Sequence, residues 1–384
     1  MKPEDRVRRI AEAAGFDRIG IAALDRAGTG GAFLRWLARG DHAGMRYLER
    51  GVEKRLDPRT VLPGARSAVC VALRYAPLES EVGSTPVAEN DLWPGVARYA
   101  RGDDYHDVML ARLEALEAEL QAAFPGTATR RYVDTGPVLE RELAAKAGLG
   151  GFGKNCNLLD PEIGSWFLIG EVLTTLALES DTQVADPCGS CTKCLEACPT
   201  GALPEPYRLD SRRCISYWTI EHRGPIPEGM RRKLGHWVFG CDVCQEVCPA
   251  NVDLGGFDRP EMELPPWRRT LTLTRLLGMS QSEYTAAFRG SAMKRAKLVG
   301  LKRNVAVAMG NLGEARFIEP LVAALGDAEP LVRAHAAWAL ARIESEPGPE
   351  SGVRGAALER ALETEKDPEA RTEINAALGL LAAR

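Results

Sequence analysis

The chain has 384 residues, which is enough for two or three domains that each have their own core. With 45% hydrophobic and 27% charged residues, its composition excludes wholesale disorder. The formal net charge of −4 argues against a protein that coats nucleic acid indiscriminately, and no apolar run approaches the roughly 20 residues that span a bilayer. The N-terminal residues lead into a charged amphipathic helix rather than an apolar signal segment, so we expect a cytoplasmic protein.

Residues 1–178 form the first predicted domain, in which helices alternate with strands. Apolar residues at helical spacing predict helices over residues 7–14, 33–37, 45–50, 108–123 and 139–147. Apolar and β-branched runs predict strands over residues 18–22 and 67–75, a strand that ends at 132–133, and a strand pair or one long strand over 166–169 and 172–176. This alternation indicates a layered α/β (α+β) sandwich.

Two features of this domain have ordinary structural explanations. Cys70 lies in an apolar run, so we expect a buried core residue. Gly148-x-Gly150-x-x-Gly153 matches the glycine pattern of dinucleotide-binding loops, but such a loop must follow a strand and open a helix. Here a predicted helix precedes the glycines, so we expect a helix cap and a turn. The alternative is close approach of the backbone to a flat cofactor other than NAD.

The second predicted domain, residues 179–266, contains eight of the ten cysteines. The run Cys188-x2-Cys191-x2-Cys194-x3-Cys198-Pro199 has the spacing of bacterial ferredoxins, in which three thiolates hold one cluster and the fourth reaches a second cluster. Cys214 and the run Cys241-x2-Cys244-x3-Cys248-Pro249 supply the remaining thiolates. This crossing rule predicts two 4Fe–4S clusters, held by Cys188, Cys191, Cys194 and Cys248, and by Cys198, Cys214, Cys241 and Cys244.

Zinc and disulfides are the alternatives to these clusters. Structural zinc usually uses two Cys-x2-Cys pairs for one tetrahedral site, which fits two consecutive x2 spacings followed by x3 and proline poorly. Ten cysteines in a chain without a secretory signal point to metal or redox use in a reducing compartment. The pattern therefore predicts a protein that moves single electrons.

Residues 267–384 form the third predicted domain, which is all-helical. The segment 305–312 recurs as 336–343 and as 374–380, with small residues on one face, which is typical of stacked HEAT-type repeats. No acidic residue lies between Glu283 and Glu314. Six basic residues fall inside that window: Arg289, Lys294, Arg295, Lys297, Lys302 and Arg303. The bias in sign predicts an interaction surface.

The chain resembles the epoxyqueuosine reductase family over essentially its whole length. In the first domain the matching motifs are Lys54-Arg55 followed by Pro58, Arg101-Gly102-x-Asp104-Tyr105-His106, Val133-Asp134-Thr135-Gly136-Pro137 and Gly153-Lys154-Asn155-Cys156. In the second they are Cys188-Gly189-Ser190-Cys191-Thr192-Lys193-Cys194, Arg213-Cys214-Ile215-Ser216-Tyr217 and Phe239-Gly240-Cys241-Asp242-x-Cys244-Gln245. Many ferredoxin-like proteins share the cysteine spacing, and its combination with the segment 133–136 is far more specific.

The resemblance implies an oxidoreductase that reduces the epoxide of epoxyqueuosine, at the wobble position of tRNA with a GUN anticodon, to the alkene of queuosine. It implies that an external low-potential donor supplies electrons, which pass through the two 4Fe–4S clusters to cobalamin. Two electrons and two protons remove the epoxide oxygen as water, so a positioned acid must protonate that oxygen. No membrane partner is implied, and we expect a monomer.

Asp134 is the predicted acid, because it closes a strand and begins a Gly-Pro turn where side chains face a cleft. A model aspartate has a pKa near 3.9, so we expect burial to raise the pKa of Asp134 for this role. The alternative is that Asp134 only caps a helix beginning at Pro137.

The resemblance also carries cofactor contacts over to this chain, many of them through backbone groups. The implied cobalamin contacts are Arg55, Ala97, Asp134, Leu158, Ile169, Ser216, Cys241 and Asp242. His106 and His222 are candidates by residue type for an axial cobalt ligand, but the resemblance implies no such protein ligand. We expect Cys156 to be a small residue lining the pocket.

For RNA, we expect Lys294, Arg295 and Lys297 to meet phosphates, which gives salt-dependent binding without sequence information. His222 lies in the segment 221–227, which we expect to form a rim that meets a splayed anticodon loop. A protein partner is the alternative occupant of the basic window.

Two other functions are compatible with the cysteines. A reductive dehalogenase also pairs cobalamin with two clusters, but such enzymes usually carry export signals and would not need a helical repeat module. An iron–sulfur electron carrier on a HEAT scaffold would bind no corrinoid. Cobalamin absorption of anaerobically purified protein distinguishes this last function from the other two.

Overall fold

The structure is a computed structural model that describes residues 1–75, 95–252, 254, 259–343 and 349–383. Its contacts divide the chain into two compact units. Unit 1 comprises residues 1–78, 102–212 and 242–263, and unit 2 comprises residues 79–101, 213–241 and 264–384. The three domain boundaries inferred from the sequence stay a prediction.

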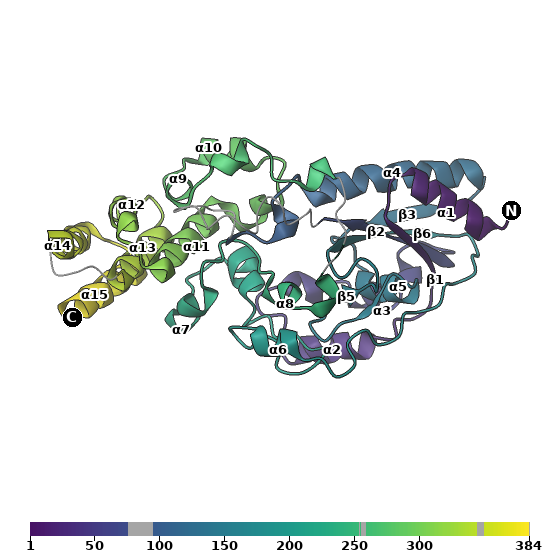
Figure 1. The fold of residues 1–384 in the computed structure, drawn as a ribbon, viewed down its shortest axis with the longest axis horizontal. Helices are drawn as coiled ribbons and strands as arrows, with labels where there is room; N and C mark the ends of the chain where they lie inside the picture. Colours follow the sequence, from purple (N-terminus) through teal and green to yellow (C-terminus); the bar gives the residue numbers. More distant parts are fainter. Residues whose placement is uncertain (76–94, 253, 255–258, 344–348, 384) are drawn as a thin grey trace. The chain divides into compact units, whose positions relative to one another are not determined.

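A four-stranded antiparallel sheet lies at the centre of unit 1 (Figure 1). Its strands, in spatial order, are β1 (Arg18–Ala23), β2 (Ser67–Arg74), β6 (Phe167–Thr174) and β3 (Thr129–Tyr132). β6 is a single long strand, which decides between the two predicted possibilities. Glu171 on β6 pairs with Cys70 on β2 and with Tyr132 on β3. The register therefore brings the end of β3, two residues before Asp134, to the middle of β6.

Helices cover both faces of this sheet. Figure 1 shows α1 (Pro3–Ala13) and α4 (Tyr105–Ala123) side by side over one face. Gly170 permits this close packing, because a Cβ there would lie 2.8 Å from the Met109 side chain on α4. α5 (Glu140–Lys146) packs on the opposite face in one core cluster with Cys70, which is fully buried as predicted.

The remaining elements of unit 1 are short. They are α2 (Gly30–Ala38), a 3-10 turn (Arg46–Glu49) where we predicted a helix, α3 (Val52–Leu56), β4 (Gly151–Phe152), β5 (Leu158–Leu159), α6 (Lys193–Ala197) and α8 (Val243–Glu246). Gly148 has φ +76° and follows α5, and β4 then pairs with β5 in a small hairpin. The glycine segment is therefore a helix end and a turn, as predicted, and not a dinucleotide-binding loop.

Unit 2 is built from helices, as predicted for the C-terminal region. They are α7 (Glu228–Arg231), α9 (Leu273–Leu277), α10 (Gln281–Phe288), α11 (Lys297–Leu312), α12 (Ile318–Ala324), α13 (Pro330–Arg342), α14 (Pro349–Thr364) and α15 (Pro368–Ala382). The three predicted repeats lie in α11, α13 and α15, of which α13 packs on both others (Figure 1). Small residues allow the approach, since a Cβ on Gly310 would lie 2.8 Å from the Ala339 Cα.

Two buried polar residues of α11 attach it to the segment that follows Cys214. The Arg303 guanidinium donates to the carbonyl oxygens of Trp218 and Gly224, both at 2.7 Å. Asn304 donates to the carbonyl oxygens of Thr219 and Val238, both at 2.8 Å. Because buried backbone carbonyls need partners, these bonds hold the short helical turn Tyr217–Glu221 in place within unit 2.

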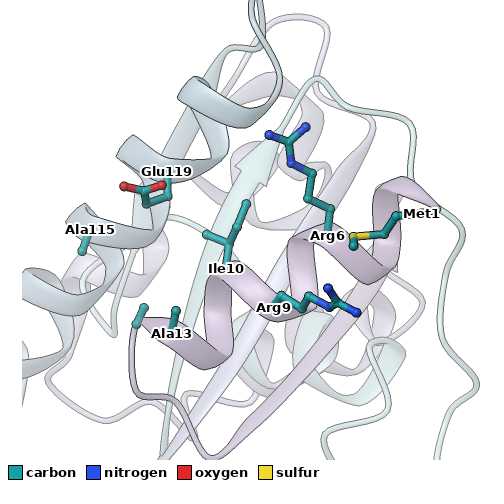
Figure 2. Close-up of a pocket in the computed structure, with 8 residues that line it drawn as sticks. Met1, Arg6, Arg9, Ile10, Ala13, Ala115 and Glu119 are labelled. Atoms are coloured by element: carbon teal, nitrogen blue, oxygen red, sulfur yellow. The ribbon is translucent and has the colours of Figure 1, made fainter.

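A hollow of about 710 Å³ lies on the surface of unit 1 between α1 and α4 (Figure 2). Its lining consists of Met1, Arg6, Arg9, Ile10, Ala13, Ala14, Ala115 and Glu119. None of the predicted site residues is among them. Within the part of the chain that the structure describes, no helix combines the length and the apolar character needed to cross a membrane.

Candidate functional site

Asp134 lies in the turn that follows β3, with its backbone at φ +55°. A positive φ is unusual for a residue other than glycine and is often found at functional sites. The next helix, α5, begins at Glu140 and has Leu139 at its N-cap, without a side-chain cap. The alternative that Asp134 caps a helix beginning at Pro137 is therefore wrong.

Two side chains from the first turn of α4 meet the Asp134 carboxylate. The Tyr105 hydroxyl donates to Asp134 Oδ2 at 2.6 Å, and His106 Nε2 lies 3.4 Å from the same oxygen. The opposite ring nitrogen, His106 Nδ1, lies 2.8 Å from Oδ1 of Asp104. Asp104 also caps α4 by accepting from the His106 backbone N–H. The cap therefore sets the position of the imidazole beside Asp134.

The charges of this group differ from the expectation for Asp134. The hydrogen bond from His106 lowers the pKa of the Asp134 carboxyl, outweighing the partial loss of solvation, and the Tyr105 hydroxyl lowers it further. Burial lowers the pKa of His106, but the hydrogen bonds to Asp104 and Asp134 outweigh it and raise that pKa to about 9. The expected rise in the pKa of Asp134 is thus wrong for this arrangement, because an imidazolium lies beside a carboxylate that is 61% exposed.

Two buried carboxyl groups lie behind Asp134, and the sequence reasoning missed both. Glu140, at the start of α5, accepts a hydrogen bond from the Asp134 backbone N–H, and burial raises its pKa. Glu171 on β6 is fully buried, and burial followed by the charge of Glu140 raises its pKa well above the usual value. Neither Glu171 oxygen has a hydrogen-bond partner among the described residues. A charged residue inside an apolar strand was the available signal.

The first predicted cluster set lies within unit 1. Burial raises the pKa of the Cys194 thiol, and the neighbouring thiols of Cys188, Cys248 and Cys191 raise it further. The four thiols therefore lie within range of one another's electrostatic influence, on and beside α6 and α8, and all are free cysteines. Four half-buried thiols in one group fit a 4Fe–4S cluster by the chemistry of the donor set.

Backbone N–H groups also point at sulfurs in this region. The Lys154 N–H lies 3.4 Å from Cys188 Sγ, and the Ala202 N–H lies 3.2 Å from Cys198 Sγ. Burial raises the pKa of Cys198, but hydrogen bonds from Thr200 and from backbone N–H groups outweigh it and lower that pKa. Such bonds stabilise thiolate and tune the potential of a cluster. Cys198 and Cys244 belong to unit 1 and Cys214 and Cys241 to unit 2, so the second set stays a prediction.

The implied cobalamin contacts are distributed over both units. In unit 1, Leu158 on β5 and Ile169 on β6 belong to or border the core cluster that contains Cys70. Burial lowers the pKa of Arg55, whose guanidinium donates to the Arg50 carbonyl oxygen at 2.6 Å. Asp242 is 2% exposed. Ala97, Ser216 and Cys241 lie in unit 2. The eight contacts stay a prediction.

The basic window lies in unit 2 and is only partly exposed. Lys294, Arg295 and Lys297 are exposed, and Arg295 forms an ion pair with Glu221 at 2.8 Å. Lys302 and Arg303 are buried, the first in an ion pair with Asp327 at 2.7 Å and the second in the backbone contacts described above. These two cations therefore serve the packing of α11 rather than the surface.

Three half-buried aromatic rings gather next to this window, and the sequence reasoning identified only one of them. Trp218 lies 4.5 Å from His222 and 5.4 Å from Tyr217, measured between ring centroids. His222 Nε2 lies 3.0 Å from the Pro225 carbonyl oxygen, and burial lowers the pKa of His222. Glu221, in the same turn, holds Arg295. Aromatic rings beside cations suit unstacked nucleobases next to a phosphate chain.

Three family models match consecutive parts of the chain. The model described as epoxyqueuosine reductase QueG, DUF1730, matches residues 55–135. A 4Fe–4S double cluster binding domain matches residues 187–251, and HEAT repeats match residues 291–379. With the structure, these matches confirm the predicted fold class: a mixed α/β N-terminal region, a ferredoxin-type 4Fe–4S domain and C-terminal helical repeats.

Curated relatives and solved structures agree with these matches. The chain is 39% identical to an epoxyqueuosine reductase from Xanthomonas campestris, over 88% of this chain and 95% of that protein. It is 41% identical to one from Gloeobacter violaceus, over 80% of this chain and 96% of that protein.

Among solved structures, an epoxyqueuosine reductase with an epoxyqueuosine-modified tRNA-Tyr stem loop superposes with a TM-score of 0.90 at 34% identity, covering 99% of this chain and 98% of that chain. A structure of the Bacillus subtilis reductase superposes with a TM-score of 0.89 at 33% identity, with 98% of both chains covered. In that structure the catalytic loop, which carries an aspartate, is swung out of the active site.

Proposed function

The chain belongs to the epoxyqueuosine reductase family, and we propose that it reduces the epoxide of epoxyqueuosine in the wobble position of GUN-anticodon tRNA to the alkene of queuosine. The observation that carries the proposal is the match over 99% of the chain to a reductase bound to an epoxyqueuosine-modified tRNA stem loop. Family membership makes the chain an oxidoreductase with a 4Fe–4S domain. It also disfavours the dehalogenase and the plain electron carrier.

The reaction sets two demands on the protein. Two electrons must reach the epoxide carbons, and two protons must reach the oxygen, which leaves as water. No side chain is a sufficient reductant for this step, so a redox group must supply the electrons. The oxygen is a poor leaving group as an alkoxide, so an acid must stand beside it.

For the electrons, we assign the two predicted cluster sets and a cobalamin. The four neighbouring thiols of unit 1 support the first cluster, and an external low-potential donor is expected to reduce the clusters. When bound, cobalamin would supply a low-potential cobalt centre that can pass electrons to the substrate. In unit 1, three side chains suit a corrin. Leu158 and Ile169 are apolar, as the faces of the ring require, and the half-buried cation Arg55 suits its polar rim.

For the protons, we assign Asp134 as the group that delivers them to the oxygen. Its carboxyl is exposed enough to meet a ligand, and Tyr105 and His106 hold it from α4. The aspartate-bearing catalytic loop of the Bacillus subtilis relative supports the assignment. The epoxide carbons take up electrons while the Asp134 carboxyl protonates the oxygen, so the C–O bond breaks without release of a free alkoxide.

For the RNA, we assign the exposed side of the basic window together with the aromatic rings beside it. Lys294, Arg295 and Lys297 would meet phosphates, and Trp218 and His222 would contact splayed bases. Because Glu221 neutralises part of the charge of Arg295, we expect Arg295 to contribute less to binding than its full charge would.

Nucleoside analysis of epoxyqueuosine-containing tRNA, after anaerobic incubation with the reduced and reconstituted protein, tests the function. We expect queuosine to form in a single turnover with the wild-type chain. Asp134→Asn should bind cobalamin and iron normally but form no queuosine, because an amide cannot donate the proton. Asp107→Asn, the same change at an exposed position on α4, is the control and should leave the yield unchanged. Wild-type yield from Asp134→Asn would exclude the acid role.

A further inference from the structure

His106 lies between two carboxylates that differ in exposure. Asp104, on the Nδ1 side, is 1% exposed, whereas Asp134, on the Nε2 side, is 61% exposed. The three groups form a line of contacts of 2.8 Å and 3.4 Å that runs from the interior toward the exposed acid. In many enzymes a carboxylate holds one ring nitrogen of a histidine while the other nitrogen transfers a proton. Here Asp104 holds Nδ1 of His106, and Nε2 faces Asp134.

An ionised Asp134 cannot protonate an epoxide. The pKa of Asp134 is lowered and that of His106 is raised to about 9. At neutral pH, Asp134 and His106 therefore share one proton available for transfer, and this proton is bound to the imidazole. The other groups that face the pair are Tyr105 on α4 and Glu140 and Arg141 on α5. Glu171 on β6 lies deeper, behind Glu140.

We propose that His106 is the proton reservoir of the reaction and that Asp134 delivers the proton it receives from His106 Nε2. This inference rests on the proposed function. The Nε2–H bond breaks as an O–H bond forms on Asp134 Oδ2, which leaves neutral His106 and a carboxylic acid. That acid then protonates the epoxide oxygen as the electrons supplied by the external reductant reach the carbon. Solvent returns a proton to His106, and a second passage supplies the second proton of the water.

The neighbouring groups fit this role less well. Tyr105 donates to the same Asp134 oxygen, but its hydroxyl is neutral, so it carries no positive charge to give up and serves to hold the carboxylate. Glu140 bonds to the backbone N–H of Asp134 rather than to its carboxylate. Of these three, His106 has the side-chain contact and the charge that the transfer requires.

The dependence of the single-turnover rate on pH, between pH 6 and 10, tests the proposal. In the wild type the rate should be constant below pH 9 and fall above it, as the pair loses its proton. In His106→Gln the proton must come from Asp134 itself, so the rate should fall about 100-fold at pH 8 and rise steadily as the pH is lowered. His236→Gln, the same change at an exposed histidine of unit 2, should keep the wild-type profile.

Asp104→Asn is the milder variant, because asparagine retains an N-cap acceptor but removes one charge from the imidazole. In Asp104→Asn, the single-turnover rate should begin to fall at a pH below 9. Titration of histidine-labelled, reconstituted full-length protein by NMR gives a readout that is independent of turnover. The His106 resonance should titrate near pH 9 in the wild type and at lower pH in Asp134→Asn.

The outcomes separate the two proposals. If the wild type forms no queuosine, the proposed function fails, while the NMR titration still reports which residue holds the proton. If the wild type turns over and His106→Gln keeps both its rate at pH 8 and an alkaline limb near pH 9, the reservoir is overturned. A uniform loss of rate with an unchanged profile would make His106 a structural residue and would likewise overturn it.

Discussion

His335 predicts a specific loss of stability in acid. It is fully buried in α13, where Nε2 accepts the Ile226 backbone N–H at 3.1 Å and Nδ1 donates to the Leu331 carbonyl oxygen at 2.7 Å. Both ring nitrogens are therefore used by the neutral form. Burial, followed by the charge of Arg231, lowers the pKa of His335 to about 3. Protonation would leave the Ile226 N–H facing a second donor.

The sign and size of the effect follow from linkage. The folded pKa lies below the unfolded value, so stability is complete above pH 6.5 and is lost as the pH falls toward the folded pKa. Each pKa unit corresponds to about 1.4 kcal/mol, so going from pH 6.5 to 4 should cost the fold about 3 kcal/mol. His335→Gln keeps an acceptor for Ile226 but does not titrate.

Amide hydrogen exchange of α13 in the full chain measures this term locally. After correction for the intrinsic pH dependence of exchange, the opening equilibrium of the wild type should rise about 150-fold between pH 6.5 and 4. His335→Gln should be less stable at pH 7 and should show a much flatter dependence. Equal slopes in the two proteins would refute the assignment of a neutral buried imidazole.

Three other perturbations have defined outcomes. Cys248→Ser should lower iron in the reconstituted protein by about four atoms per chain, as measured by iron analysis, whereas Cys156→Ser should not, since Cys156 lies outside both predicted sets. Replacing Lys294 and Lys297 with alanine should weaken tRNA binding and flatten its salt dependence, whereas Lys233→Ala, also exposed in unit 2, should not; an unchanged slope excludes phosphate contacts. Glu373→Gln should destabilise the protein by roughly 3 kcal/mol in thermal melts, because it leaves the buried Arg231 guanidinium without its anion; a melting temperature equal to the wild-type value would show that the pair contributes little.

Periodic and closely spaced features could be predicted from the sequence. The helical repeats of α11, α13 and α15 were confirmed because a buried helix face repeats along the chain. The cluster region was identified because three of the four ligands predicted for the first cluster lie three residues apart, a spacing that is visible in the sequence itself. The strand β6 and the burial of Cys70 followed from largely apolar runs, which Gly170 and Glu171 interrupt in β6.

The state of charge at the site depended on contacts between distant segments. Asp134 was expected to have a raised pKa, but α4 brings His106 to it from 28 positions earlier in the chain and lowers that pKa. Likewise, two cations of the basic window turned inward, where Arg303 binds backbone carbonyls more than 75 positions away. The sequence shows which residue types are available and how far apart they lie along the chain. The burial of a side chain and its contacts with distant residues, which set its pKa, exist only once the chain has folded.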